Sequence, residues 1–147
     1  MFISINIIIT FCVFYCNTLQ LNYESTVNYI QLTPCQSSFK IGIGKYNFDY
    51  DALITENYYR ECTFLIESPA KSQMHMNATI SIPNLDSSNF CTYSVKMFDV
   101  QSISSPTLLG EYCESTNITD LTTYSNIIYI LIKISSKGLF QLDIDTA

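Results

Sequence analysis

The 147-residue chain has no tryptophan, one histidine, four glycines and four prolines. It contains no Gly-rich loop able to cradle a phosphate, and its turns must also use Asn, Asp and Ser. Only 7 Lys and Arg residues stand against 13 Asp and Glu, which gives a net charge of −6. An acidic surface repels phosphate backbones, so the composition argues against nucleic acid as a partner. The length indicates a single folded domain.

The N-terminal stretch, residues 2–16, carries no charge and is mostly apolar. This is the length of the hydrophobic core of a secretory signal peptide, and it is shorter than the ~20 residues that a membrane-spanning helix needs. Cys16 and Thr18 offer small side chains where signal peptidase requires them. No Lys or Arg precedes the apolar run, so an uncleaved anchor is the alternative. We predict a signal peptide over residues 1–18 and a secreted protein.

Cleavage after residue 18 would remove Cys12 and Cys16 and leave four cysteines: Cys35, Cys62, Cys91 and Cys113. An even number of cysteines in a secreted chain indicates disulfides, and four cysteines allow three connectivities. Zinc-binding cysteines come in pairs two to four residues apart, and no such pair remains. The cysteines therefore predict two disulfides rather than a zinc site.

Strand patterns dominate the rest of the chain. Apolar residues alternate with polar ones over residues 77–82, 93–97 and 140–144, as in half-buried strands. The almost unbroken apolar run Ile127–Ile134 predicts a central strand buried on both sides. No helical stripe appears outside the signal segment. We predict an all-β antiparallel sandwich over residues 35–147, with residues 19–34 as a short leader that carries only a weak strand signal.

Several short motifs then occur in a fixed order. They are Tyr59–Ile66 (Tyr-Arg-Glu-Cys-Thr-Phe-Leu-Ile), Cys91–Tyr93 (Cys-Thr-Tyr), and Leu109–Cys113 (Leu-Gly-Glu-Tyr-Cys). In order and spacing, the segment 35–144 resembles a CUB domain, a secreted two-disulfide β-sandwich of jelly-roll type. This resemblance implies the disulfides Cys35–Cys62 and Cys91–Cys113.

Many CUB domains bind calcium through three acidic side chains at one end of the sandwich. Asp86 matches the first of these positions, Ser94 stands at the second, and Ser135 and Ser136 stand where the third is expected. Calcium needs six to eight oxygen ligands, and its affinity falls as carboxylates are removed. We therefore expect no metal site of the family type, and no cofactor.

Candidate catalytic groups are sparse. His75 is the single histidine, predicted in a turn or at a strand edge, and no Gly-x-Ser-x-Gly elbow accompanies it. Disulfide formation would leave no free thiol. The carboxylate pairs Asp49/Asp51 and Glu111/Glu114 could serve a glycosidase, but they lie beside turns or cysteines, where solvated charge is the simpler interpretation. We expect no enzyme activity.

Two sequons, at Asn77 and Asn117, predict N-linked glycans on the surface of a chain that follows the secretory pathway. Asn117 is expected in a polar loop. Tyrosines exceed what one small core can bury and are favoured at interfaces. They suggest a binding surface formed by Tyr46, Tyr50, Tyr58, Tyr59, Tyr112 and Tyr124. The alternative is that many of these tyrosines support the two sheets from the edge.

Together these features predict a secreted, non-catalytic recognition module for an extracellular protein or glycan, acting without calcium. One alternative is an accessory module of an extracellular protease whose catalytic domain lies elsewhere. Another is a structural component of a coat or secretion. Neither the ligand nor the oligomeric state follows from the sequence.

Overall fold

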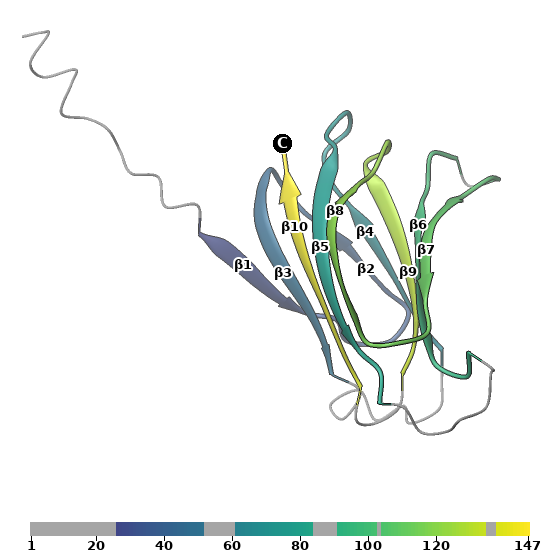
Figure 1. Cartoon of the computed structure of the whole chain (residues 1–147). Coiled ribbons are helices and arrows are strands. Elements are labelled where there is room, and N and C mark those ends of the chain that lie inside the picture. Colours follow the sequence, from purple (N-terminus) through teal and green to yellow (C-terminus); the bar gives the residue numbers. More distant parts are fainter. Residues whose placement is uncertain (1–25, 52–60, 84–90, 103, 135–137) are drawn as a thin grey trace, which may run out of the picture.

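The computed structural model describes residues 26–51, 61–83, 91–102, 104–134 and 138–147, which form two packed five-stranded sheets (Figure 1). The first sheet contains, in spatial order, β1 (Val27–Gln31), β3 (Gly44–Asp51), β10 (Leu139–Thr146), β5 (Met74–Ser81) and β8 (Thr116–Thr122). The second contains β2 (Ser37–Lys40), β4 (Cys62–Glu67), β9 (Ile127–Lys133), β6 (Ser94–Asp99) and β7 (Thr107–Tyr112). Neighbouring strands are antiparallel except in the pairs β1–β3 and β2–β4. The predicted β-sandwich is confirmed, and none of the described segments is a helix long and apolar enough to cross a membrane.

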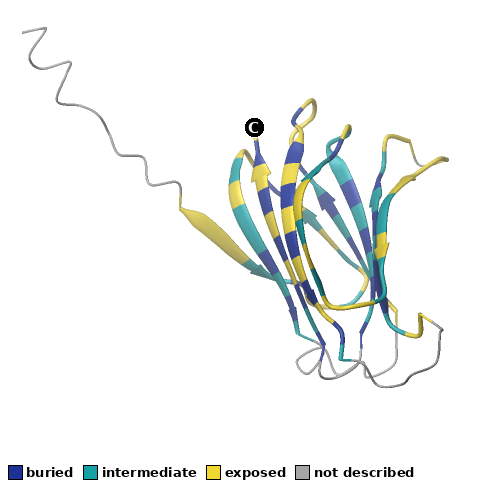
Figure 2. Cartoon of the chain, viewed as in Figure 1, coloured by how far each residue is buried: buried dark blue, intermediate teal, exposed yellow. Residues whose placement is uncertain are grey.

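The core lies between the sheets because side chains alternate between the two faces of each strand. The alternation is complete on β5 and β10, where buried and exposed residues follow each other along the strand (Figure 2). Aromatic rings join the two layers: Tyr50 on β3 meets Phe64 on β4 edge to face, with centroids 5.8 Å apart. The strands predicted from alternating patterns are therefore confirmed.

Strand β9 is central in its sheet, as its apolar run predicts. Ile128, Ile130 and Ile132 are fully buried between the sheets. The prediction that this strand is buried on both sides is wrong, because its other side chains lie on the outer face of the sheet and are partly exposed. An unbroken apolar run has the same appearance in sequence whether its second face is covered or open.

The segment predicted as a leader contributes a strand. β1 pairs in parallel with β3, from Val27 opposite Lys45 to Gln31 opposite Asp49. Leu32, the next residue, is fully buried, and its N–H donates to the Asp49 carbonyl at 2.8 Å. The sandwich therefore includes residues ahead of Cys35. The predicted signal peptide lies outside the described residues.

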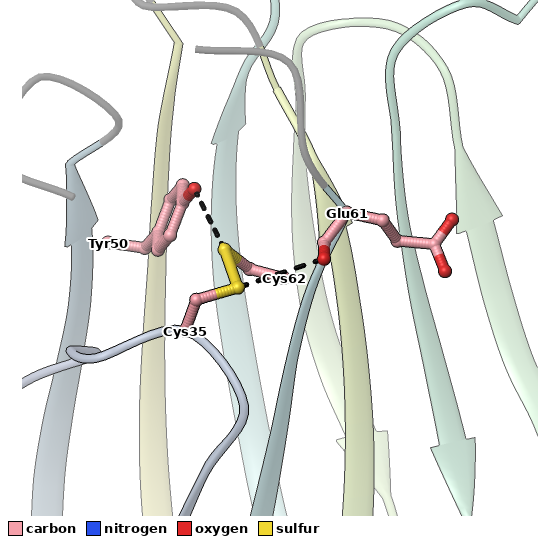
Figure 3. Close-up of a disulfide and its surroundings, with 4 residues drawn as sticks. All are labelled: Cys35, Tyr50, Glu61 and Cys62. Carbon is pink, nitrogen blue, oxygen red and sulfur yellow. Dashed lines mark hydrogen bonds between the residues drawn. A yellow bond between two sulfur atoms is a disulfide. The ribbon is translucent and has the colours of Figure 1, made fainter. Parts of the chain in front are cut away.

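Both disulfides join the cysteines that the CUB resemblance implies, so this pairing is confirmed. Cys35 and Cys62 have Cα atoms 5.0 Å apart, and Cys91 and Cys113 have theirs 5.3 Å apart. Figure 3 shows the first bridge under the Tyr50 ring, whose hydroxyl donates to the Cys62 sulfur at 3.7 Å. This bridge ties the β1–β2 connection, where Cys35 is partly buried, to the fully buried Cys62 at the start of β4.

A buried carboxylate fixes the turn between β8 and β9. Asp99, at the end of β6, is fully buried. Its carboxylate accepts hydrogen bonds from the Tyr124 N–H at 2.7 Å, from the Ser125 N–H at 3.2 Å, and from the Ser125 hydroxyl. Because β6 pairs with β9, these bonds hold the turn, which leads from the first sheet to the second, against the end of the second sheet. The role of Asp99 is therefore structural.

Candidate recognition surface

The calcium positions of the family can be located only in part. Asp86, Ser135 and Ser136 lie outside the described residues. Ser94 is buried at the start of β6. Among the described residues, the one group of three potential metal ligands is Cys91, Glu111 and Cys113, and its two cysteines form a disulfide. A disulfide sulfur is not a thiolate and offers no metal ligand of that kind.

His75 is the second residue of β5, so it lies near the end of a strand, as predicted, and that strand is an inner one of the first sheet. Its side chain is exposed, and its Nδ1 atom lies 3.2 Å from the Thr122 hydroxyl on β8. This contact links two surface side chains on neighbouring strands.

The two predicted carboxylate pairs lie in different sheets and do not combine into one site. Asp49 and Asp51 belong to β3 in the first sheet, while Glu111 belongs to β7 in the second and forms an ion pair with Lys96 at 2.9 Å. Burial, and secondarily the neighbouring Asp51 carboxylate, raise the pKa of Asp49 above its ordinary value of 3.8. Asp49 is the one described carboxylate with a resolved shift, and its Oδ1 atom is buried without a hydrogen-bond partner.

The prediction that Tyr50 belongs to an exposed tyrosine surface is wrong. Tyr50 is fully buried because it shares the inward face of β3 with Phe48. Tyr46 and Tyr112 are half-buried and pack against the core. Tyr58 and Tyr59 lie outside the described residues. Tyr124 is 80% exposed at the β8–β9 turn. The described tyrosines of the predicted set therefore form no continuous surface.

Tyr112 explains the Leu-Gly-Glu-Tyr-Cys motif. Its ring lies over Gly110, two residues away on the same strand, and a Cβ atom at Gly110 would overlap it. The register of β6 and β7 shifts at this point, between Met97 and Phe98, which is the mark of a β-bulge. The glycine therefore provides space for a tyrosine that closes the edge of the core.

Both sequons lie on the outer face of the first sheet. Asn77 is exposed on β5, and Asn117 is exposed on β8, a strand rather than the predicted loop. The two strands are paired, with Asn117 opposite Thr79. The Asn77 side-chain oxygen accepts the Asp120 N–H at 3.1 Å. Glycans on these residues would occupy neighbouring parts of one face.

This outer face is polar and acidic. Asp143 accepts a hydrogen bond from the Asn47 side chain at 2.7 Å, and Asp145 pairs with Lys45 at 3.9 Å. An open depression of about 480 Å³ crosses the same region, and its polar side chains include Lys45, His75, Asn77, Asp120, Asp143 and Asp145. Tyr29 on β1 lies opposite Asn47 and is 80% exposed. The sequence interpretation missed Tyr29 because its strand fell within the predicted leader.

The outer face of the second sheet has the opposite character. One row of directly opposite residues crosses four strands and is apolar throughout: Leu65, Tyr129, Phe98 and Leu108. The Phe98 and Tyr129 rings are in contact, with centroids 6.0 Å apart. Leu108 is 50% exposed, and the other three are partly exposed. Both inward and outward faces of β9 are apolar, which is what produced its unbroken apolar run.

Two ion pairs flank this row. Lys96 on β6 pairs with Glu111 on β7 at 2.9 Å, and Lys40 on β2 pairs with Glu67 on β4 at 3.3 Å. The first pair is in register with Leu131 on β9, and the second with Ile127. The row and these two β9 residues form what we call the apolar cross: Leu65, Phe98, Leu108, Ile127, Tyr129 and Leu131.

No family model and no curated protein matches this chain. Among solved structures, it is similar to the full extracellular region of zebrafish Gpr126/Adgrg6, with a TM-score of 0.45 and 16% identity over 78% of this chain and 15% of that one. It is also similar to the pre-peptidase C-terminal domain of a collagenase from Bacillus anthracis, with a TM-score of 0.30 and 8% identity over 78% of this chain and 98% of that one. The chain spans about 15% of the length of the zebrafish protein. Scores this low support no argument about function.

Proposed function

We propose that this chain is a secreted, CUB-like module that recognises an extracellular protein, without catalysis and without calcium, through the apolar cross. The two disulfides support an oxidising, extracellular location. The CUB-like assignment is supported by the confirmed cysteine pairing and by the structural reason for Gly110 in its motif.

The observation that carries this proposal is the exposed apolar row on the second sheet. A contiguous apolar patch on a protein surface marks an interaction site more often than a scattered apolar residue does. Phe98 and Tyr129 are aromatic anchors of the kind that dominate protein interfaces. Charged side chains surround the row and do not interrupt it, as in an interface with an apolar centre and a polar rim.

The position of the sequons supports the same face. Asn77 and Asn117 lie on the first sheet, on the opposite side of the sandwich. Glycans there would shield the acidic face and leave the apolar cross accessible. None of the described residues on the second sheet belongs to a sequon.

The test is binding of the full secreted chain to cell surfaces and to a panel of extracellular proteins, with and without a calcium chelator. We expect the paired substitution Phe98→Thr and Leu108→Thr to weaken binding at least tenfold, and the chelator to have no effect. Threonine favours strands, so the sheet should persist. Gln141→Ala, on the outer face of the first sheet, is the control. Unchanged binding by the paired variant with an unchanged melting temperature would refute the assignment of this face.

The depression on the first sheet favours a second candidate, recognition of a glycan. Carbohydrate hydroxyls need donors and acceptors, which Lys45, Asn77 and Asp143 provide, and Tyr29 offers an exposed ring beside them. A glycan array probed with Thr79→Ala protein tests it, because that variant removes the sequon of Asn77, keeps the Asn77 side chain, and frees the depression of any sugar of its own. Glycan binding that disappears when Tyr29→Ala is added to this variant supports the candidate. Equal glycan binding with and without Tyr29→Ala contradicts it.

A further inference from the structure

We propose that the partner of the apolar cross is a second copy of this chain, packed face to face about a two-fold axis. This inference rests on the proposed function, since it concerns the same surface, and it names the occupant. The arrangement of apolar and charged residues about Tyr129 carries it.

The apolar residues form two crossing lines. One line runs across the strands as Leu65, Tyr129, Phe98 and Leu108, and the other runs along β9 as Ile127, Tyr129 and Leu131. A copy turned by about 90° lays its row over the β9 line of the other copy. Orthogonal packing of two sheet faces is one of the two arrangements that sheets adopt. In this crossed orientation the two apolar lines of each copy cover those of the other, and the positions of the charges select it over an aligned one.

The charges are arranged with opposite sign about the same centre. Lys96 lies on β6 in register with Leu131, the outward-facing residue of β9 that follows Tyr129. Glu67 lies on β4 in register with Ile127, the outward-facing residue that precedes Tyr129, so it is equally far from Tyr129 in the opposite direction. Glu111 and Lys40 lie one strand further out on the two sides. A half-turn in the plane of the sheet therefore exchanges each cation for an anion.

One two-fold axis satisfies both the crossing of the apolar lines and the pairing of opposite charges. It lies in the plane of the interface, passes through Tyr129, and is at right angles to the line that joins the two ion pairs. With strands about 4.8 Å apart and same-face residues about 6.8 Å apart, it brings Glu67 of one copy within about 3 Å, in the plane, of Lys96 of the other. Glu111 then faces Lys40 of the second copy in the same way. Each contact occurs twice, as an isologous interface requires.

The other face does not suit a second copy. Its carboxylates, among them Asp49, Asp143 and Asp145, would repel their own copies, and it carries both sequons. The outer face of the second sheet carries Lys40, Lys96 and Lys133 against Glu67 and Glu111, so its charges are nearly balanced. A net charge of −6 opposes association elsewhere on the molecule and leaves this face as the place where copies can meet.

The size of the face sets the expected strength. Five strands, each about six residues long, cover roughly 24 by 20 Å, or about 500 Å² per copy. This is at the low end of specific interfaces, so we expect a dimer that dissociates at micromolar concentrations. Sedimentation should therefore cover the range from about 1 to 100 μM.

Charge reversal gives the decisive test. We expect sedimentation of the glycosylated full chain to show a concentration-dependent dimer, and Lys96→Glu and Glu67→Lys each to raise its dissociation constant at least tenfold. Mixing the two variants should restore dimers, because both cross-interface contacts in the mixed pair are again between opposite charges. Each variant alone places like charges together at both contacts. The mixture therefore separates loss of the interface from loss of the fold, and Lys71→Glu, in the exposed turn ahead of β5, is the matched control.

Three outcomes would overturn the dimer: a wild-type chain that stays monomeric throughout the range, reversed variants that dimerise like wild type, or a mixture no better than its components. A monomer whose binding to other extracellular proteins still depends on Phe98 and Leu108 overturns the dimer and leaves the proposed function standing. A restored mixed dimer without any other extracellular ligand supports the dimer and counts against wider recognition.

Discussion

Replacing Asp99 with alanine removes the carboxylate that holds the β8–β9 turn to the end of β6. The carboxylate is fully buried and accepts three hydrogen bonds, one from the Tyr124 N–H and two from Ser125. Alanine leaves these donors facing a small cavity. We expect the turn to detach from β6 and the sandwich to lose stability without a change of topology.

The magnitude follows from the partners. A hydrogen bond to a charged group contributes about 1.5–3 kcal/mol, and three bonds that share one acceptor are not additive. Part of the turn is open to water, which replaces some of the lost partners. We expect Asp99→Ala to cost about 3 kcal/mol, a large fraction of the 5–15 kcal/mol typical of a domain. Asp99→Asn retains one acceptor oxygen and should cost about half as much.

The assay is urea unfolding of the disulfide-intact domain, followed by circular dichroism, with the slope compared between variants. Asp145→Ala is the control, because its carboxylate pairs with exposed Lys45 at 3.9 Å and should contribute less than about 1 kcal/mol. A double-mutant cycle of Asp99→Asn with Ser125→Ala should give a coupling of about 1 kcal/mol. A loss below 1 kcal/mol for Asp99→Ala, or no coupling to Ser125, would refute the anchoring role.

Three further predictions concern stability. Replacing both cysteines of the Cys35–Cys62 bridge, which closes a loop of 27 residues, should cost about 3.5 kcal/mol in urea unfolding, and a cost below 1 kcal/mol would contradict its role. Gly110→Ala should cost about 1–3 kcal/mol because its Cβ overlaps the Tyr112 ring, while Gly42→Ala, whose Cβ meets only ordinary contacts, is the control; equal melting temperatures for the two would contradict the overlap. Because the pKa of Asp49 is raised in the folded state, the free energy of unfolding falls as pH rises above 3.8. Asp49→Asn should therefore stabilise the domain near pH 7 and lose that advantage in thermal melts below pH 3.8. A gain in stability that persists in acid would point to another cause.

Local patterns in the sequence were sufficient for several strands. Residues 77–82 and 140–144 alternate with a period of two, which requires one wet and one dry face, and β5 and β10 have these faces. The CUB resemblance supplied the cysteine pairing, since composition alone left three possibilities open. These features depend on short segments or on motif order, and both can be read along the chain.

Other features depended on partners distant in sequence. β1 forms by pairing with β3, so its own residues gave only a weak signal. The tyrosines of β3 could not be assigned to a face by their abundance, and Tyr50 proved to be buried between the sheets. The anchoring of Tyr124 and Ser125 by Asp99 joins residues 25 and 26 positions apart.

The sequence by itself determined that this chain forms strands, carries four cysteines beyond residue 18, and has a net negative charge, because composition and period-two alternation are local properties. Only the tertiary structure decided which apolar residues stay exposed. Leu65, Phe98, Leu108 and Tyr129 come from four strands, and only sheet pairing places them in one row beside ion pairs of opposite order. A surface made by strand order cannot be read from any one strand, because each strand contributes a single residue to the row.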